Sequence, residues 1–304
     1  MQASEETKEK PNEEQQPEGF SYRINELNYA GYLSEVRLME DRLRVASFNA
    51  NSIRNRLEVI LDWMKQQDCD VVCVQETKVT DAEFPIAPII EAGYHCAFKG
   101  QKTFNGVAII SRHELDDVQI GTGNELWDQE ARIIRATVKG ITVVNTYIPQ
   151  GTSIDSPRFQ YKIDWIRGMR EYFNSSFTPN DPIVWVGDFN VAREPIDVYD
   201  PEGLYGGVCY SPEEHKALDY VKDWGFVDVF RKHHPDEPRL YTFWDYRMLA
   251  FRRKLGWRID HIWATRPLAD KSIDSWIDIE PRRLEKPSDH TFITADFDIL
   301  SFGN

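Results

Sequence analysis

The residues of this sequence that could carry out chemistry stand at the ends of apolar segments. They are amides, carboxylates, a tyrosine and a histidine: Asn49, Glu76, Tyr147, Asp188 with Asn190, Asp260, and Asp289 with His290. Acidic and amide groups are costly in apolar surroundings unless they are paired or bind a metal ion. If the apolar segments are strands, their polar ends can converge on one rim of a sheet. The pattern therefore predicts a single site rather than a scattered polar surface.

Each of these residues also has a simpler interpretation. Glu76 alone is equally well explained as a helix cap or a surface charge, and Asp188 and Asn190 in GDFN are common turn formers. Asp289 and His290 could be a loop pair that bonds local backbone. The joint occurrence of all the motifs, in this order, favours a functional site.

Seven short segments rich in β-branched and aromatic residues would position these groups. The predicted strands are 43–48, 71–74, 107–110, 141–146, 183–186, 259–263 and 292–297. Several are apolar on both faces, so a second sheet must cover one face and helices the other. A doubly wound parallel sheet is the competing architecture, but the glycine-rich phosphate turn typical of it is missing from the sequence.

Three helices are predicted from apolar spacing and capping residues. One follows Asn55, and a second has Ser156 as its N-cap. A third begins at the capping box Ser211–Glu214 and ends at Gly225. Their apolar faces are predicted to belong to the core rather than to a cofactor site.

Length, composition and charge exclude several classes of protein. The 304 residues are 41% hydrophobic and 28% charged, which is typical of a folded, soluble chain. No apolar run approaches the roughly 18 residues that span a bilayer. The N-terminus lacks the basic and then apolar pattern of a signal peptide, so we expect an intracellular protein of cytoplasm or nucleus and not a secreted one. The four cysteines are too few for a disulfide scaffold and are expected to be buried free thiols. The net charge of −14 argues against a protein that coats nucleic acid through charge alone.

Three regions are expected along the chain. Residues 1–20 are predicted to form a disordered acidic tail whose partner is unknown, and residues 21–40 a docked segment of uncertain shape. Residues 41–300 are predicted to form one catalytic domain, because no linker or internal repeat interrupts them. Nothing in the sequence requires an oligomer, so we expect a monomer.

The motifs FNANSIR, QETK, TYIPQG, GDFN, RIDHI and KPSDH, in that order, resemble the exonuclease III family of AP endonucleases. The resemblance runs from about residue 43 to residue 297 and includes SPEE, WGFVDVFR and YTFWDYR between the motifs. It implies an α/β fold, a four-layer α/β/β/α sandwich with two sheets face to face. It also implies Mg²⁺-dependent cleavage, with Mn²⁺ able to substitute, of the phosphodiester 5′ to abasic sites in double-stranded DNA, and 3′–5′ exonuclease or 3′-end cleaning activity.

The resemblance also implies a role for each motif residue. Glu76 resembles the principal metal ligand, with Asn49 and Asp289 as helpers. Asp188 resembles the group that activates water, and Asn190 and Asn49 would orient it. His290 resembles the group that contacts the scissile phosphate, with Asp260 as its partner, and Tyr147 resembles a phosphate-contacting or leaving-group residue.

Physical chemistry supports these roles independently. Glu76 and Asp289 offer the hard oxygen ligands that Mg²⁺ takes while it keeps several waters. Asp188 can serve as a general base, and Asp260 beside His290 favours the imidazolium form that would face a phosphate oxygen. Whether one or two metal ions act stays open at this point, because Asp188 with Asn190 could host a second ion.

Substrate recognition is expected from an aromatic segment and the basic residues beside it. By the same resemblance, an apolar pocket for the base-free sugar is formed by Phe243, Trp244, Trp257 and Ile259. The alternative is that these aromatic residues belong to the core. DNA-backbone contacts are expected from Gln150, Arg247, Arg252, Arg253 and Lys254, with Lys99 and Lys102 as further candidates.

The sequence departs from the family pattern in three places. Asn51 stands where some relatives have a metal-binding aspartate, which implies a weaker or shifted ion. The stretch 204–207 replaces DNA-contacting asparagines, and Ser153 replaces an intercalating arginine, which leaves Arg247 as the expected wedge. Two alternative functions are a phosphomonoesterase acting on lipid or nucleotide phosphates and a scaffold that binds nucleic acid without cleaving it. The scaffold is disfavoured because every catalytic position is present.

Overall fold

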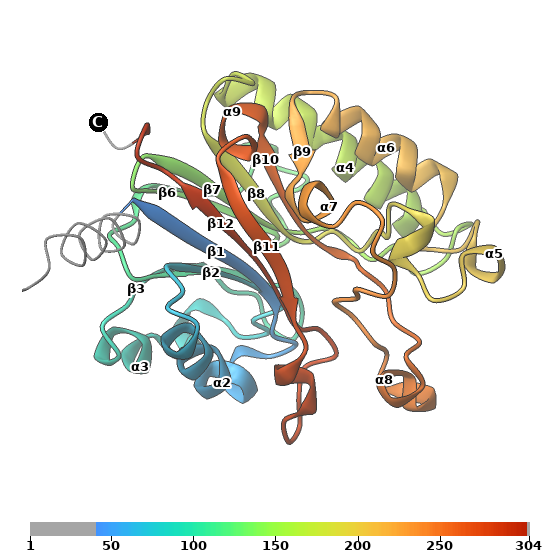
Figure 1. The fold of residues 1–304 in the computed structure, drawn as a ribbon, viewed down its shortest axis with the longest axis horizontal. Helices are drawn as coiled ribbons and strands as arrows, with labels where there is room; N and C mark the ends of the chain where they lie inside the picture. The colour runs from blue at the N-terminus through green and yellow to red at the C-terminus, as the bar shows by residue number, and fades with distance from the viewer. Residues whose placement is uncertain (1–40, 303–304) are drawn as a thin grey trace, which may run out of the picture. The chain divides into compact units, whose positions relative to one another are not determined.

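Two mixed β-sheets face each other in the computed structural model, which describes residues 41–302 (Figure 1). The strands of the first sheet lie in the order β11 (Ser272–Asp278), β12 (Phe292–Asp298), β1 (Arg42–Asn49), β2 (Val71–Gln75), β4 (Val107–Ser111) and β3 (His95–Lys99). Those of the second lie in the order β5 (Asp116–Ile120), β6 (Ile133–Val138), β7 (Ile141–Tyr147), β8 (Ile183–Asp188), β10 (Asp260–Thr265) and β9 (Phe226–Asp228). Within this described range β1 is parallel to β2 and β7 to β8, and the other pairs are antiparallel.

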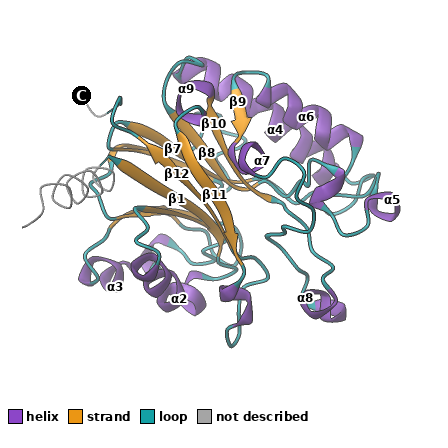
Figure 2. Ribbon diagram, in the orientation of Figure 1, coloured by secondary structure: helices purple, strands orange, loops and turns teal. Residues whose placement is uncertain are grey.

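Helices cover the outer face of each sheet (Figure 2). The first sheet is covered by α2 (Ile53–Gln66) and α3 (Ile86–Glu91), and the second by α4 (Pro157–Ser176) and α6 (Pro212–Lys222). Short helical segments lie in the connections: η1 (Asp81–Glu83), η2 (Pro195–Asp197), α5 (Pro201–Leu204), α7 (Val229–His233), η3 (Arg247–Leu249), α8 (Ala250–Arg253), α9 (Arg266–Ala269) and η4 (Glu280–Arg283). The segment around α8 projects away from the sheets (Figure 1).

The alternation of side chains along each strand produces this layering. In β2, Val71 and Cys73 pack between the sheets, whereas Val72 and Val74 pack under α2. All four side chains are fully buried, because a strand with two covered faces has no solvent side. A third apolar cluster, which includes Trp165 of α4, lies between the second sheet and its helices. The predicted four-layer α/β/β/α sandwich is confirmed, and the doubly wound parallel sheet is wrong because most strand pairs are antiparallel.

All seven predicted strands are present, and their observed ends lie within two residues of the predicted ones. The N-caps are also confirmed: Ser156 Oγ accepts a hydrogen bond from the N–H of Phe159. Ser211 and Glu214 form the predicted capping box, although α6 ends at Lys222, before Gly225. Strands β3, β5, β9 and β11 were not predicted, since they are short, exposed or edge strands that lack a continuous apolar run. Strand β6 was not predicted either, although it is an interior strand, because Arg135 and Thr137 interrupt its apolar residues.

The remaining expectations concern the termini and the cysteines. The predicted tail (1–20) and docked segment (21–40) lie outside the described residues. All four cysteines are free thiols; three are buried and Cys96 is half-buried. None of the helices described between residues 41 and 302 combines the length and the apolar content that crossing a membrane requires.

Candidate active site

The polar residues at the strand ends lie at one shared rim of the two sheets. Asn49 is the last residue of β1, Tyr147 of β7 and Asp188 of β8. Asp260 opens β10, which is antiparallel to β8, so that Asp260 pairs directly with Asp188. Glu76 follows β2, and its positive φ of 51° turns the chain out of the strand. The rim therefore combines the carboxyl ends of parallel strands with the amino end of an antiparallel one.

Asn49 joins the carboxylates of Glu76 and Asp188. Its Nδ2 donates to Glu76 Oε1 at 2.8 Å and to Asp188 Oδ2 at 2.9 Å. Because Asn49 is fully buried and its Oδ1 accepts from the N–H of Asn51, the amide is fixed with its donors toward the carboxylates. One carboxylate from each sheet is thereby held beside a single amide group.

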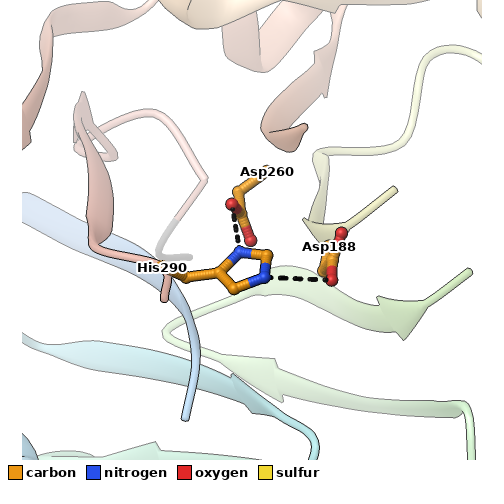
Figure 3. A group of neighbouring side chains, drawn as sticks. All are labelled: Asp188, Asp260 and His290. Carbon is orange, nitrogen blue, oxygen red and sulfur yellow. Dashed lines mark hydrogen bonds and ion pairs between the residues drawn. The ribbon is translucent and has the colours of Figure 1, made fainter. Parts of the chain in front are cut away.

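His290 lies between two aspartates (Figure 3). Its Nδ1 is 2.8 Å from Asp260 Oδ2, and its Nε2 is 3.8 Å from Asp188 Oδ2. Burial disfavours the charged imidazolium, but the negative charges of Asp260 and Asp188 outweigh burial and raise the pKa of His290 to about 10. At neutral pH the ring therefore carries a positive charge and donates its Nδ1–H to Asp260.

Asp188 is a buried carboxyl group with a fixed orientation. Its Oδ1 accepts a hydrogen bond from the backbone N–H of Asn190 at 2.9 Å, and Asn49 binds its other oxygen. Burial raises the pKa of Asp188 above its usual range, although the charge of His290 opposes this shift. A carboxyl group with a raised pKa can take a proton from water, which is the property required of a general base.

Tyr147 presents a protonated hydroxyl group to the same site. Burial and the nearby carboxylates of Glu76 and Asp188 raise the pKa of Tyr147 well above its ordinary value. Arg132 holds the residue in place: its guanidinium lies 4.8 Å from the centre of the Tyr147 ring and donates to the Tyr147 carbonyl at 3.0 Å. The hydroxyl group therefore stays protonated and acts as a hydrogen-bond donor, with the Glu76 carboxylate as its partner.

Oxygen atoms of Glu76 and Asn51 bind the Lys78 ammonium next to this cluster. Lys78 Nζ is 2.7 Å from Glu76 Oε2 and also donates to Asn51 Oδ1. Asn51 Nδ2 donates to Asp289 Oδ1 at 3.0 Å, which brings a second carboxylate to the group. Carboxylate and amide oxygens are the donors that hard divalent cations take, so the residues fit such an ion.

Asp188, Asp260 and His290 form a second group whose ligand atoms lie within 4.8 Å of one another. Both ring nitrogens of His290 face carboxylates there, and the ring is positively charged at neutral pH. In this charged form the trio can stabilise negative charge, and metal binding would require the ring to lose a proton.

A cavity of about 590 Å³ adjoins these groups. Its polar lining comes from Glu76, Tyr147, Gln150, Asp188, Asn190, Asp245, Arg247, Asp289 and His290. Its apolar lining includes Phe243 and Trp257, whose backbones bond each other in an antiparallel bridge. The Phe243 ring lies 4.9 Å from the His290 ring, so the apolar wall directly meets the catalytic candidates.

The profile of the Endonuclease/Exonuclease/phosphatase family matches residues 46–290. The chain belongs to this family. The matched range contains every catalytic and metal-binding candidate from Asn49 to His290. The polar rim is therefore the part of the fold on which the family match and the geometry of the site agree.

Curated and solved family members resemble the chain over most of its length. It is 32% identical over 266 residues to an exodeoxyribonuclease III of Haemophilus influenzae, covering 84% of this chain and 100% of that protein. It is 31% identical to the DNA repair nuclease APEX1 of Danio rerio, covering 83% and 81%. Among solved structures, an AP endonuclease from Archaeoglobus fulgidus has a TM-score of 0.81 and 47% identity, covering 84% and 99%. A 3′ phosphatase, NExo, from Neisseria bound to product DNA hairpin has a TM-score of 0.82 and 38% identity, with the same coverage.

The cavity of this family member does not include every residue expected from the sequence. Asn49 and Asp260 lie behind the lining and act on it through hydrogen bonds. Trp244 is buried in a cluster with Tyr241 and Ala250 and does not itself line the cavity. For Trp244, therefore, the alternative interpretation as a core residue is the one that the structure supports. The basic residues of α8 and its C-terminal flank are exposed outside the cavity: Arg252, Arg253 and Lys254.

The cavity also contains residues that the sequence did not single out. They are Tyr199, Val208, Cys209, Asp245, Met248, Ala250 and Leu255. Met248 follows the predicted Arg247 and is 70% exposed. A methionine side chain belongs to none of the catalytic motifs, so there was no reason in the sequence to select it. Val208 and Cys209 follow the stretch 204–207, where the sequence departs from the family pattern, so a motif comparison alone could not find them.

Proposed function

We propose that this protein is a metal-dependent DNA repair nuclease that hydrolyses the phosphodiester 5′ to abasic sites and also trims 3′ ends. The observation that carries the proposal is the single amide of Asn49, which joins the carboxylates of Glu76 and Asp188. A cationic histidine and an apolar-walled cavity adjoin these groups. Four relatives named for nuclease, AP endonuclease or 3′ phosphatase activity support the same class. We expect the protein to act as a monomer on duplex DNA.

Asp188 is proposed to act as the general base. Asn49 binds one of its oxygens and the N–H of Asn190 binds the other, so the carboxyl group cannot rotate away from the cavity. It would take a proton from the water that attacks phosphorus. Its raised pKa favours proton uptake in the transition state.

His290 is proposed to stabilise negative charge on the phosphoryl group. Asp260 keeps the ring protonated and oriented through Nδ1. The Nε2–H would donate to a phosphoryl oxygen, where a buried cation has most effect on developing charge. Tyr147 is proposed to donate its hydroxyl proton to a phosphoryl oxygen or to the departing 3′ oxygen, because its raised pKa keeps it protonated.

Glu76 and Asp289 are proposed to hold the metal ion, for which we propose Mg²⁺, with Mn²⁺ able to substitute. Asn49 would assist by orienting Glu76, and Asp188 with Asn190 offer a second position. The bound ion would neutralise charge on the phosphoryl oxygens and lower the pKa of water. The Lys78 ammonium, 2.7 Å from Glu76 Oε2, supports the part of this assignment that concerns Glu76, because its carboxylate already has a cation as a partner.

The apolar side of the cavity is proposed to receive the base-free sugar of a flipped-out nucleotide. Phe243, Trp257 and Ile259 would contact the sugar, and the cavity would exclude a normal base by its shape. The exposed arginines and lysine from Arg247 to Lys254 are proposed to bind the DNA backbone on the projecting segment, together with Gln150.

The test compares cleavage of four duplexes by the full chain: one with an abasic site, one with uracil, one intact and one with a 3′-phosphate end. After treatment with EDTA, added Mg²⁺ should restore incision on the 5′ side of the abasic site. Glu76→Gln and Asp188→Asn should abolish incision while the circular dichroism spectrum stays that of the wild type. Near-wild-type incision by both variants, or activity that survives chelation, would contradict the proposal.

Removal of a 3′ phosphate from DNA is a second candidate activity. It is favoured by the 38% identity to a protein named as a 3′ phosphatase. The same residues could serve, since a phosphate monoester needs the same in-line attack and charge stabilisation. An inositol phosphate in the panel distinguishes this activity from that of a general phosphomonoesterase, which would release phosphate from both substrates.

A further inference from the structure

Lys162 places a buried ammonium group directly behind the catalytic loops. The residue lies on α4, the helix that covers the second sheet, and its side chain is fully buried. Lysine is almost never fully buried unless its charge is paired. None of the catalytic roles proposed above uses this residue, so its burial needs a separate explanation.

The three donors of the Lys162 ammonium are all engaged. One N–H donates to the Asn190 carbonyl at 2.7 Å and another to the Gln150 carbonyl at 3.1 Å. The third binds the carboxylate of Glu214, which is also fully buried. Lys162 therefore ties the loop after β7 to the loop after β8.

Glu214 extends these ties to a third segment. Its Oε1 accepts from the N–H of Cys209 at 2.9 Å, and its Oε2 accepts from the N–H and the hydroxyl of Ser211. Cys209, like Gln150, lines the cavity. One ion pair thus fixes two catalytic loops and the cavity wall that precedes α6.

The atoms that Lys162 holds are directly linked to the proposed general base. The N–H of Asn190 binds Asp188 Oδ1, and the Asn190 side chain donates to the carbonyl of Ile148. A shift of the Asn190 backbone would therefore change the orientation of the Asp188 carboxylate. Placement errors of about 1 Å at a reacting group can cost about 100-fold in rate.

An apolar pair would fill the same space at a smaller desolvation cost, because burying two charges is expensive even when they are paired. Apolar side chains, however, supply no donors for the carbonyls of Gln150 and Asn190. The buried Asn190 carbonyl would then lose its partner, which native structures avoid, and the Gln150 carbonyl would lose its link to α4. The charged pair is therefore suited to positioning rather than to stability alone.

We propose that Lys162, with Glu214 as its counter-ion, is a positioning residue for the cleavage reaction, which sets the geometry of Asp188 and Asn190 without touching the substrate. The proposal rests on the proposed nuclease function for its rate measurement. It predicts a loss in kcat with little change in KM, because the bound substrate contacts neither side chain.

The first test uses the variant Lys162→Met/Glu214→Gln, which removes both charges and leaves no buried ion unpaired. Its kcat on the abasic duplex should fall by about 10- to 100-fold, with KM within about threefold of the wild type. The matched control is Ile166→Ala, a fully buried position one turn further along α4 that perturbs the same apolar cluster but removes no hydrogen bond to either loop. The control should keep kcat within about threefold of the wild type.

The second test does not depend on catalysis. Amide hydrogen exchange should become faster in peptides that cover residues 148–151 and 188–192 in the double variant, and stay unchanged there in the control. If the wild-type chain does not cleave the abasic duplex, the proposed function fails, whereas the exchange data still decide the role of Lys162. Equal kcat and equal exchange in the double variant and the control would overturn the proposal.

If the double variant does not fold, the single variant Glu214→Gln decides. It keeps the ammonium but weakens the hold on it, so kcat should fall by about three- to tenfold, with faster exchange in the same two peptides. Exchange and kcat that match those of the Ile166→Ala control would overturn the proposal in this case as well.

Discussion

Replacing Asp260 by asparagine tests whether the proposed phosphate-facing cation depends on its buried partner. Asp260 is fully buried and its Oδ2 is 2.8 Å from His290 Nδ1. Asparagine has nearly the same shape but no negative charge, so the substitution removes an electrostatic interaction and little packing. Two unit charges 4 Å apart interact by about 4 kcal/mol at an effective dielectric constant of about 20.

This interaction energy sets the expected loss of rate. A loss of about 4 kcal/mol corresponds to about 1000-fold, and the remaining carboxylate of Asp188 compensates in part, so we expect kcat to fall by about 100- to 1000-fold. KM should stay within about threefold, because the charge acts on the transition state more than on the bound substrate. The measurement is single-turnover incision of a labelled abasic duplex at saturating enzyme and fixed ionic strength.

A double-mutant cycle of Asp260 and His290 shows whether the two residues act as one unit or independently. If Asp260 acts through His290, then Asp260→Asn/His290→Asn should be no slower than His290→Asn alone. Losses that multiply in the double variant, or a kcat for Asp260→Asn within about threefold of the wild type, would refute the assignment of the pair. Near-ultraviolet circular dichroism of each variant controls for an altered fold.

Three further predictions concern stability, substrate choice and DNA binding. Burial opposes ionisation of Asp197, but the guanidinium groups of Arg258 and Arg231 outweigh it and hold the pKa of that carboxyl below its usual range. The stability that this group contributes is therefore present above the unfolded pKa of about 3.9 and is lost as pH falls through the lower folded pKa. Asp197→Asn should accordingly make the free energy of unfolding, measured in urea, less dependent on pH on the acid side. An unchanged pH dependence would count against the ion-pair network of Asp197. Trp257→Ala should lower the ratio of kcat/KM for abasic over intact duplex by about tenfold, and an unchanged ratio would remove Trp257 from the proposed sugar pocket. Arg247→Ala should weaken duplex binding at every sequence and reduce the slope of log Kd against log salt by about one, whereas an unchanged slope would exclude a backbone contact.

The strands could be predicted from the sequence because burial on both faces leaves a strong local signal. Val71–Val74 is apolar at every position, and the structure shows why: alternate residues enter two different cores. Strand β5 lies at a sheet edge with all its residues exposed, so no apolar pattern marks it. Its pairing with β6 is a tertiary property that a short sequence window does not contain.

The site could be predicted only as a set of motifs. The motif order places Asp188 and Asp260 at strand ends, but their direct pairing depends on the antiparallel register of β8 and β10. The position of Trp244 was not predictable either, since an aromatic residue beside Phe243 suits a pocket and a core equally well. The proposed role of Lys162 has no sequence signal, because it depends on hydrogen bonds to the backbone carbonyls of Gln150 and Asn190, which lie in other segments of the chain.

The formal charges of the site can be compared with the number of divalent ions proposed to bind there. Four carboxylates meet at the rim, from Glu76, Asp188, Asp260 and Asp289, and two cations lie among them, Lys78 and His290. With all six groups ionised the formal charge is −2, which one Mg²⁺ neutralises. A second divalent ion would bring the formal charge to +2, or to +1 with a bound phosphodiester group. Since His290 already places a fixed positive charge between two carboxylates, the protein itself supplies part of the charge stabilisation that a two-metal site would draw from its second ion.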